Sequence, residues 1–234
     1  DYDPDTISKI YKKNPKRLLK RLWQTLIPIL AYIFSVGWDK LTGRLKNELQ
    51  ARSRARELTN LLVELGPAFV KAGQALSTRP DIIPAILLEE LSDLQDQLPG
   101  FDGGKAMELI EEDLGSKIDE LFLEIDKEPI SAASLGQVHK AKLKNDEVVA
   151  VKVQRPGLRE QITLDLYIVR NIAYWLKNNI GLIRSDLVAL IDELGKRVFE
   201  EMDYLNEAEN AEKFRKMHNH NQMIAVPKIY KEIT

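Results

Sequence analysis

The chain has 234 residues, 44% of them hydrophobic and 30% charged, which is the composition of a folded protein with one large domain or one domain plus an extension. Its formal net charge of −2 provides no basic field that would recruit nucleic acid, so we expect no nucleic-acid partner. Because the chain contains no cysteine, disulfides, zinc–thiolate sites and thiol nucleophiles are excluded, and we expect a reducing compartment.

The N-terminal segment, residues 1–40, combines a basic run with an uncharged stretch. It starts with Asp-Tyr-Asp-Pro-Asp, which is not a secretory signal peptide, and without Met, so we expect the sequence to begin partway into a longer protein. The basic run, residues 12–21, precedes residues 22–38, which carry no charge and have Trp23 and Trp38 near their ends. These seventeen residues are short for a bilayer span, and the pattern favours a helix lying on an anionic membrane surface. Packing on the protein itself and a true span are the alternatives.

A helical segment is predicted next, over residues 41–117. Leucines spaced three and four apart predict a helix over 41–65, and Gly66-Pro67 ends it. Gly66-Pro67 also starts a second helix, which continues over 68–79, because Pro is favoured at the first helical position. The apolar stripe of this second helix consists of Phe69, Ala72 and Leu76.

Lys71 and Gln74 are three residues apart, so they project from one edge of the second helix. Gly73 lies between them and costs about 1 kcal/mol of helix stability relative to Ala. Such a glycine indicates either the close approach of another backbone or a ligand, or a notch for packing.

Residues 87–98 predict a short amphipathic helix. The glycine-rich stretch after it, residues 100–105, is not a phosphate-binding loop, because its spacing is one residue short and Ala106 replaces the required Ser or Thr. We expect Asp102 to cap a helix over 105–114 instead.

A small antiparallel sheet is predicted from strands over 121–129, 138–143 and 148–154. The loop 131–137 consists mainly of small residues, which let backbone N–H groups approach a phosphate, although ordinary hairpin turns share this composition. Lys152 lies in an otherwise apolar strand, where its burial is costly unless an anion meets it.

Helices are predicted after the sheet. A turn near 178–181 separates a first helix from a second one over 187–194, and a strand is expected over 228–234. One face of the first helix consists of Leu164, Ile168, Ile172 and Trp175. His218 and His220 are two apart on an expected loop without a further ligand nearby, so no metal site is predicted in this chain.

The helix predicted over 196–214 is the most acidic part of the chain. Asp203 and Glu207 are four apart on it, and their carboxylates repel each other unless a cation lies between them. Lys71 and Lys152 are the candidate cations, and a solvated acidic face is the alternative.

Four stretches together resemble the UbiB/AarF/ADCK family of atypical kinases. Lys71-Ala-Gly-Gln74 resembles the Lys-x-Gly-Gln signature of this family, and residues 131–139 resemble the alanine-rich loop that replaces the kinase glycine-rich loop. Val149-Ala-Val-Lys152 resembles the third-strand lysine motif, and Glu201–Ala208 resembles the family's Glu-x-Asp-Tyr-x-x-Glu-Ala segment. The resemblance begins at about residue 45, and the N-terminal segment looks most like cyanobacterial and plastid members.

The resemblance implies an α+β fold. Residues 118–234 would form a protein-kinase-like N-lobe, with a small antiparallel sheet plus helices, truncated before the catalytic loop. Residues 41–117 would form the family-specific helical extension that carries the Lys-x-Gly-Gln motif. The larger C-lobe would be absent from this chain.

The resemblance also implies the site residues. Lys152 would orient the nucleotide phosphates, with Glu207 as its helix partner and Glu201 as the alternative. Lys71 would meet Glu201 and Asp203 in a regulatory ion pair, which places its helix over the site that a protein substrate would otherwise enter. The residues expected at the nucleotide are Ser131, Ala132, Ala133, Ser134, Gly136, Val138 and Lys152. The predicted catalytic set consists of Lys71, Gln74, Lys152 and Glu207.

The implied function is an ATPase, or a small-molecule or lipid kinase, that supports isoprenoid quinone or prenyl-lipid metabolism at a membrane of a cyanobacterial cell or plastid. Its ligands would be ATP or ADP with Mg²⁺, and its partners a membrane surface or prenyl lipid and lipid-biosynthesis proteins. The catalytic-loop and Asp-Phe-Gly motifs of kinases do not occur here, so we expect the Mg²⁺ ligands in the larger lobe and no turnover by this chain alone. A non-catalytic, pseudokinase-like scaffold that binds nucleotide or lipid and a structural membrane-surface protein are the alternatives.

Overall fold

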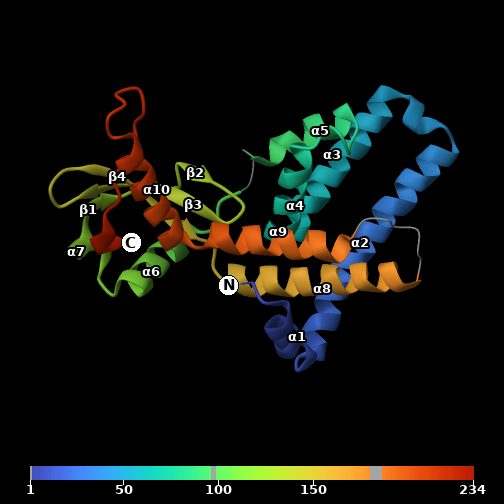
Figure 1. The fold of residues 1–234 in the computed structure, drawn as a ribbon, viewed down its shortest axis with the longest axis horizontal. Helices are drawn as coiled ribbons and strands as arrows, with labels where there is room; N and C mark the ends of the chain where they lie inside the picture. Colours follow the sequence, from blue (N-terminus) through green and yellow to red (C-terminus); the bar gives the residue numbers. More distant parts are fainter. Residues whose placement is uncertain (1, 96–98, 180–185) are drawn as a thin grey trace.

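The computed structural model describes residues 2–95, 99–179 and 186–234. Figure 1 shows an elongated molecule with the sheet and α6, α7 and α10 at one end, α2 to α5 at the other, and the long helices α8 and α9 running alongside each other between them. The helices are α1 (Pro4–Lys12), α2 (Pro15–Leu41), α3 (Glu48–Leu65), α4 (Pro67–Ser77), α5 (Ala85–Ser92), α6 (Gly103–Leu114), α7 (Ile118–Leu121), α8 (Leu158–Asn179), α9 (Leu187–Met202) and α10 (Tyr204–His218). The strands are β1 (Phe122–Ile125), β2 (Ser131–Ala132), β3 (Gly136–Leu143) and β4 (Val148–Gln154).

Helix α2 is longer than the uncharged stretch in the sequence, and it continues through Pro28 for 27 residues. It ends at Leu41, where the sequence predicts the start of the next helix. That helix, α3, begins instead at Glu48, because the side chain of Asn47 accepts a hydrogen bond from the N–H of Leu49 and caps it. None of the helices in the described ranges is long and apolar enough to cross a membrane.

Helices α3, α4 and α5 pack together at the helical end. The buried core between them consists of Val70, Leu91 and Leu94. The apolar stripe predicted for α4 is correct at Phe69, which packs against the core, but wrong at Leu76, which is 40% exposed, whereas Gly73 and Ser77 are buried. A Cβ atom at Gly73 would lie 2.5 Å from Cδ1 of Leu94 and 2.8 Å from Cδ1 of Leu62. Of the two interpretations of this glycine, the structure therefore supports the packing notch.

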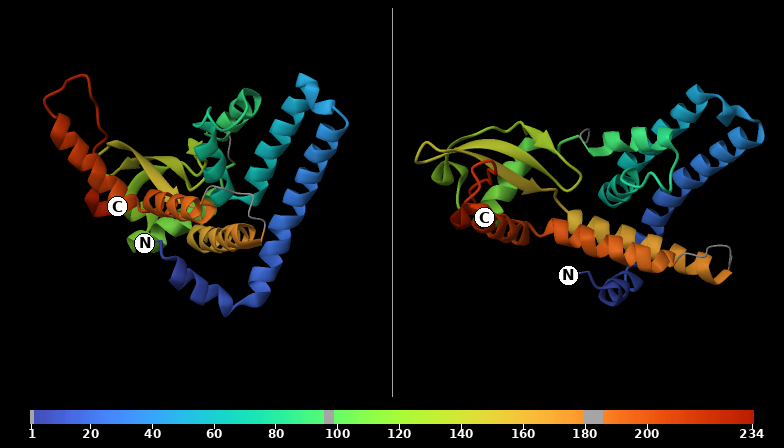
Figure 2. Two further views of the ribbon diagram at one scale, coloured as in Figure 1. Left: turned by 45° about the vertical axis from the view of Figure 1, so that its right-hand side comes forward. Right: turned by 45° about the horizontal axis from the view of Figure 1, so that its top comes forward.

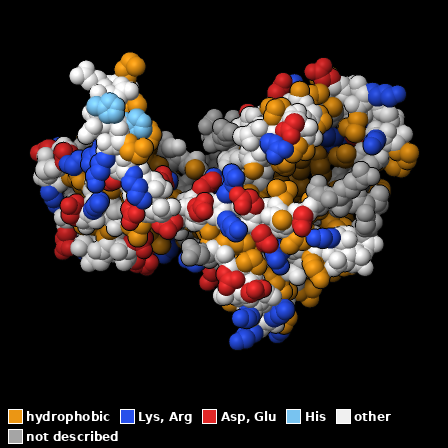
Figure 3. Space-filling model, in the orientation of Figure 1, with side chains coloured by type: hydrophobic (Ala, Val, Ile, Leu, Met, Phe, Trp, Pro, Cys, Tyr) orange, Lys and Arg blue, Asp and Glu red, His pale blue; other side chains and the backbone are white. Residues whose placement is uncertain are grey.

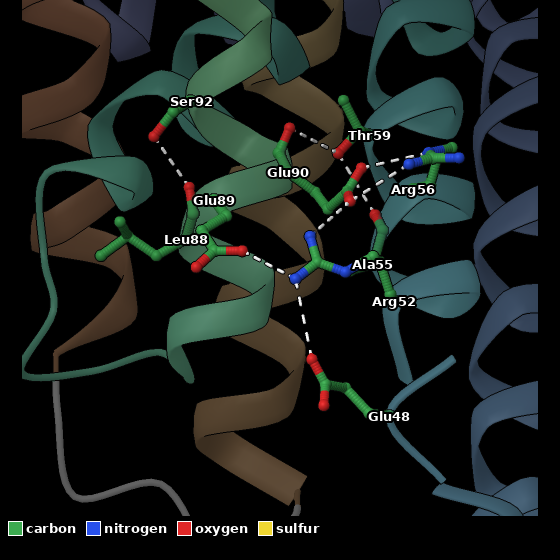
Figure 4. A network of polar contacts seen from close by, with 9 residues as sticks. All are labelled: Glu48, Arg52, Ala55, Arg56, Thr59, Leu88, Glu89, Glu90 and Ser92. Atoms are coloured by element: carbon green, nitrogen blue, oxygen red, sulfur yellow. Dashed lines mark hydrogen bonds and ion pairs between the residues drawn. The ribbon is translucent and has the colours of Figure 1, made fainter. Parts of the chain in front are cut away.

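A network of charged residues joins α3 to α5 (Figure 4). Arg52 donates to Glu90 at 3.2 Å and to Glu89 at 2.9 Å, and Arg56 donates to Glu90 at 3.2 Å. Glu90 is buried, and its backbone carbonyl accepts a hydrogen bond from the hydroxyl of Thr59. The guanidinium groups of Arg56 and Arg52 hold the pKa of Glu90 below its usual value, so this carboxylate is charged at neutral pH.

The sheet is antiparallel and has β3 at its centre. Strand β4 pairs along one edge of β3, and β1 and β2 pair along the other. The first strand is shorter than predicted, and β2 forms inside the predicted loop 131–137, so only residues 133–135 remain as a loop. Asp102 caps α6 as predicted, because its carboxylate accepts a hydrogen bond from the N–H of Lys105 at 2.8 Å. Helix α6 then covers one face of the sheet, packing against it around Ala106 and Ile110.

The acidic helix predicted over 196–214 is two helices in the structure. The N–H of Asp203 donates to the carbonyl of Glu200 at the end of α9, and its carboxylate accepts from the N–H of Asn206 at 2.9 Å and caps α10. An Asp side chain that competes for backbone N–H groups favours such a break over a continuous helix.

Two further predictions for the C-terminal half need correction. Of the face predicted for α8, Leu164 and Ile168 are buried, but Trp175 is 57% exposed. The strand predicted over 228–234 is not formed, and a 3₁₀ turn, η3 (Lys231–Ile233), occupies this stretch. The turn predicted near 178–181 falls partly outside the described residues.

Candidate functional site

Lys152 on β4 and Glu207 on the first turn of α10 form an ion pair, with 2.6 Å between Nζ and Oε2. The two side chains are 44% and 57% exposed, so the expectation that Lys152 is buried is wrong. Its strand lies at the edge of the sheet, and Val153 is the only buried residue on it. Lys152 therefore lies at the wall of an open cavity. Glu201, the alternative partner predicted for Lys152, pairs with Lys71 instead.

A cavity of about 580 Å³ extends over this ion pair. It is lined by residues of α4, β2, the loop 133–135, β3, β4, α9 and α10. All the residues predicted at the nucleotide line it except Ala132. The cavity is also lined by residues that were not predicted from the sequence: Leu135, Arg197, Glu200, Tyr204, Asn206 and Asn210. Asn206 and Asn210 are four residues apart, a spacing that places both side chains on one side of a helix and could have indicated that they share a site.

The loop 133–135 is held in place by backbone hydrogen bonds. The N–H of Ala133 donates to the carbonyl of Gly136 at 2.8 Å, and the guanidinium of Arg155 donates to the carbonyl of Ala133 at 3.0 and 3.1 Å. Ser134 and Leu135 are buried, and Leu135 belongs to the core shared by α4, α8 and α9. The loop is thus a fixed wall of the cavity.

Lys71 on α4 forms an ion pair with Glu201 on the last turn of α9. The Lys71 side chain is 19% exposed, so it is better covered than Lys152. Asp203 does not share this pair, contrary to the prediction, because its carboxylate caps α10 instead. The Lys71–Glu201 pair connects the helical end of the molecule to the cavity.

Tyr204, the first residue of α10, lies beneath Lys152. The Nζ atom of Lys152 is 4.3 Å from the centroid of the Tyr204 ring, which is a cation–π distance. The hydroxyl group is buried, has no hydrogen-bond partner among the described residues, and lies where a Cβ atom at Gly136 would be only 2.5 Å away. Burial, followed by the charge of Glu207, raises the pKa of Tyr204 to about 12, so the phenol is neutral.

Gln74 lies outside the cavity. Its Nε2 donates to the carbonyl of Leu94 at 2.9 Å and fastens the 3₁₀ turn η2 (Asp93–Gln95) to α4. The structure therefore does not bring Gln74 to the other residues of the predicted catalytic set. No group of three His, Asp or Glu side chains in the described part of the chain is arranged to hold a metal ion.

The fold and the cavity together define a kinase-like protein. In kinases, a lysine on a strand of the small sheet pairs with a glutamate on a helix, next to a loop that covers the nucleotide phosphates. Lys152, Glu207 and the loop 133–135 have this arrangement. The chain belongs to the ABC1 atypical kinase-like family, since the profile of the ABC1 atypical kinase-like domain matches residues 93–234.

Relatives come from cyanobacteria and plastids. The chain is 50% identical over 234 residues to the uncharacterized protein sll0005 of Synechocystis, covering all of this chain and 34% of that protein. It is 50% identical to an aarF domain-containing protein kinase of Arabidopsis thaliana chloroplasts and 40% identical to Protein ACTIVITY OF BC1 COMPLEX KINASE 3 of the same organelle, covering 99% and 100% of this chain and 33% of each protein. A solved structure, the complex of Rv3197 with erythromycin from Mycobacterium tuberculosis, has 30% identity and a TM-score of 0.47 over 81% of this chain and 49% of that one. The chain spans about a third of the length of the three relatives named here.

Proposed function

We propose that the chain is the nucleotide-binding part of an atypical kinase-like protein and that ATP or ADP occupies the cavity with its phosphates at Lys152. The observation that carries this proposal is the Lys152–Glu207 ion pair beside the loop 133–135. Glu207 holds the ammonium group at the cavity wall, and the three N–H donors of that group suit phosphate oxygens. The small side chains of Ala133 and Ser134 leave room for a phosphate near the backbone.

Phosphoryl transfer needs groups that this sequence does not supply. Kinases use a catalytic-loop Asp, a metal-binding Asn and the Asp of an Asp-Phe-Gly motif, and none of these motifs occurs in the chain. We therefore propose that another segment holds Mg²⁺ and that this chain binds nucleotide without turning it over. The same absence favours the second candidate, a non-catalytic scaffold that binds nucleotide or lipid.

The contact between α4 and α9 favours a small acceptor over a protein. The Lys71–Glu201 pair fastens the helical end of the molecule beside the cavity. By the family resemblance, this is the side from which a protein substrate would enter. We propose an isoprenoid quinone or another prenyl lipid as the substrate class, with lipid-biosynthesis proteins as partners. The cyanobacterial and chloroplast origin of the relatives supports placing this role in such a cell or organelle.

Titration of the purified chain with a fluorescent ATP analogue tests the proposal. Lys152→Met is expected to weaken binding about tenfold or more, because a hydrogen bond to a charged group contributes about 1.5–3 kcal/mol. Lys140→Met, at an exposed lysine of β3, is the matched control and should leave the affinity unchanged. Lys71→Ala should alter the affinity without unfolding the chain. Equal affinities for the wild type and Lys152→Met would refute the proposal, and ATP hydrolysis by the chain would contradict a metal site in another segment.

A further inference from the structure

Helix α2 buries charged side chains against the protein, beside the inward-packed Leu18 and Leu22, and exposes a row of apolar side chains to solvent. On its inner side, Arg21 donates to both oxygens of the buried Asp165 on α8, at 2.6 and 2.8 Å. Asp39 is fully buried and accepts hydrogen bonds from Arg54 and Gln50 of α3, both at 2.7 Å. In a helix at a water-exposed surface, the side that faces solvent is polar instead.

The opposite side of α2, which we call the outer face, is a continuous apolar stripe. Its members recur at spacings of three and four, so they share one side of the helix, and each is at least half exposed. From Leu19 to Leu41 the stripe runs for about 33 Å, at a rise of 1.5 Å per residue. Figure 2 shows α2 along one edge of the molecule, with the described helices packed on its other side. The outer face consists of Leu19, Trp23, Ile27, Leu30, Phe34, Trp38 and Leu41, with Ile33 beside them.

Such a long exposed stripe of large apolar side chains is rare on a monomeric soluble protein, so it indicates a partner. The charged residues near the outer face then indicate which kind of partner binds there. No Asp or Glu occurs from residue 6 to residue 38, and Figure 3 shows basic side chains gathered where α1 and α2 meet. A second copy of this chain could not neutralise these charges through the same face, because Asp39, the one acidic residue of α2, is buried. The exposed lysines at this end are Lys12, Lys13, Lys16 and Lys20.

We infer that the outer face of α2 lies on an anionic lipid bilayer, with the helix parallel to the surface and the lysines among the headgroup phosphates. Its apolar side chains then enter the boundary between headgroups and acyl chains to a depth of about 5–10 Å. Trp23 and Trp38 lie where indole rings are favoured, with the ring in an apolar layer and the N–H near water. This inference deepens the membrane part of the proposed function and is independent of the nucleotide site.

Sedimentation of the chain with vesicles tests this surface. The chain should bind vesicles of phosphatidylcholine mixed with phosphatidylglycerol more tightly than vesicles of phosphatidylcholine alone. The double variant Lys16→Gln/Lys20→Gln should bind the mixed vesicles about 25-fold more weakly, because each lysine near an anionic surface contributes about 1 kcal/mol. Phe34→Gln should weaken binding to the mixed vesicles about tenfold, since the change removes a buried aromatic group from the bound state only. Met223→Gln and Lys216→Gln, at exposed positions in and after α10, are the matched controls and should bind as the wild type does.

Tryptophan fluorescence gives a second readout. The chain has three tryptophans, so Trp175→Phe leaves only Trp23 and Trp38, whose emission should shift to the blue and be quenched by brominated lipid in the mixed vesicles. No vesicle binding, or binding that Phe34→Gln and the lysine variant leave unchanged, would overturn the inference. A wild-type dimer that Phe34→Gln converts to a monomer would assign the face to a second copy and overturn it as well. Nucleotide affinity measured without vesicles is expected to be the same in all these variants, so failure of the nucleotide proposal is seen separately.

Discussion

The ion pair between Arg21 and Asp165 allows a quantitative test of how α2 is held on α8. The guanidinium donates to both carboxylate oxygens and to the carbonyl of Leu65, and the two side chains are only 17% and 1% exposed. Arg21→Met keeps a long apolar side chain between the helices but leaves the carboxylate buried without its partner. Removing one member of a buried pair costs about 3–5 kcal/mol, and we expect the free energy of unfolding to fall by this amount near neutral pH.

The loss of unfolding free energy in Arg21→Met should grow as the pH rises. Burial raises the pKa of Asp165, and the hydrogen bonds and charge of Arg21 oppose this effect only in part. A carboxyl group whose pKa is raised in the folded state contributes stability below its unfolded pKa and loses it as pH rises through the folded pKa. In the Arg21→Met variant nothing opposes the effect of burial, so the pKa of Asp165 rises further. The variant should therefore be closest to the wild type near about pH 4, the usual pKa of Asp, and furthest from it near neutral pH.

Urea unfolding followed by circular dichroism at several pH values measures both effects. Arg17→Met is the matched control, because Arg17 lies one turn earlier on α2 and pairs with Glu160 of the same helix α8 at 2.8 Å. Those side chains are 53% and 68% exposed, so this change should cost less than about 1 kcal/mol. A cost of Arg21→Met no larger than that of Arg17→Met, or one that shrinks as pH rises, would show that this pair does not hold α2 on α8 as described.

Three further changes test the site and the helical end. Gly136→Ala should lower the free energy of unfolding by about 1–3 kcal/mol, because its Cβ would lie 2.5 Å from both the Tyr204 hydroxyl and a backbone carbonyl; an unchanged thermal midpoint would contradict this packing. Tyr204→Phe keeps the aromatic ring and should retain nucleotide affinity, whereas Tyr204→Leu should weaken it several-fold in the same titration; equal losses would show that the ring is not what matters. Because Arg56 lowers the pKa of Glu90, the contribution of that carboxylate is lost as pH falls through its pKa, and Glu90→Gln should make urea midpoints less sensitive to acid than those of the wild type.

Features that depend only on residues close together in the sequence were predictable from it. The cap at Asp102 and the start of α4 at Pro67 follow from local hydrogen bonding and from the geometry of proline, and both are present. The exposure of Lys152 was not predictable, because apolar neighbours along a strand do not reveal that the strand lies at an open edge of the sheet. The break at Asp203 was missed because helical spacing continues across it, while the side chain that caps α10 is indistinguishable from one more acidic residue.

The two ion pairs at the cavity differ in how firmly they hold their lysines. Lys152 and Glu207 are both close to half exposed, so water already competes for their contact and the pair contributes at most about 1 kcal/mol. A phosphate group that draws Lys152 toward the cavity therefore displaces little stabilisation. Lys71 is better covered, and its partner Glu201 belongs to α9, which packs on α8 in a shared apolar core. Helix α8 is fixed in turn by Arg21 on α2. Nucleotide binding is thus expected to change the contacts of α10 first and to leave α9 and the helices behind it where they are.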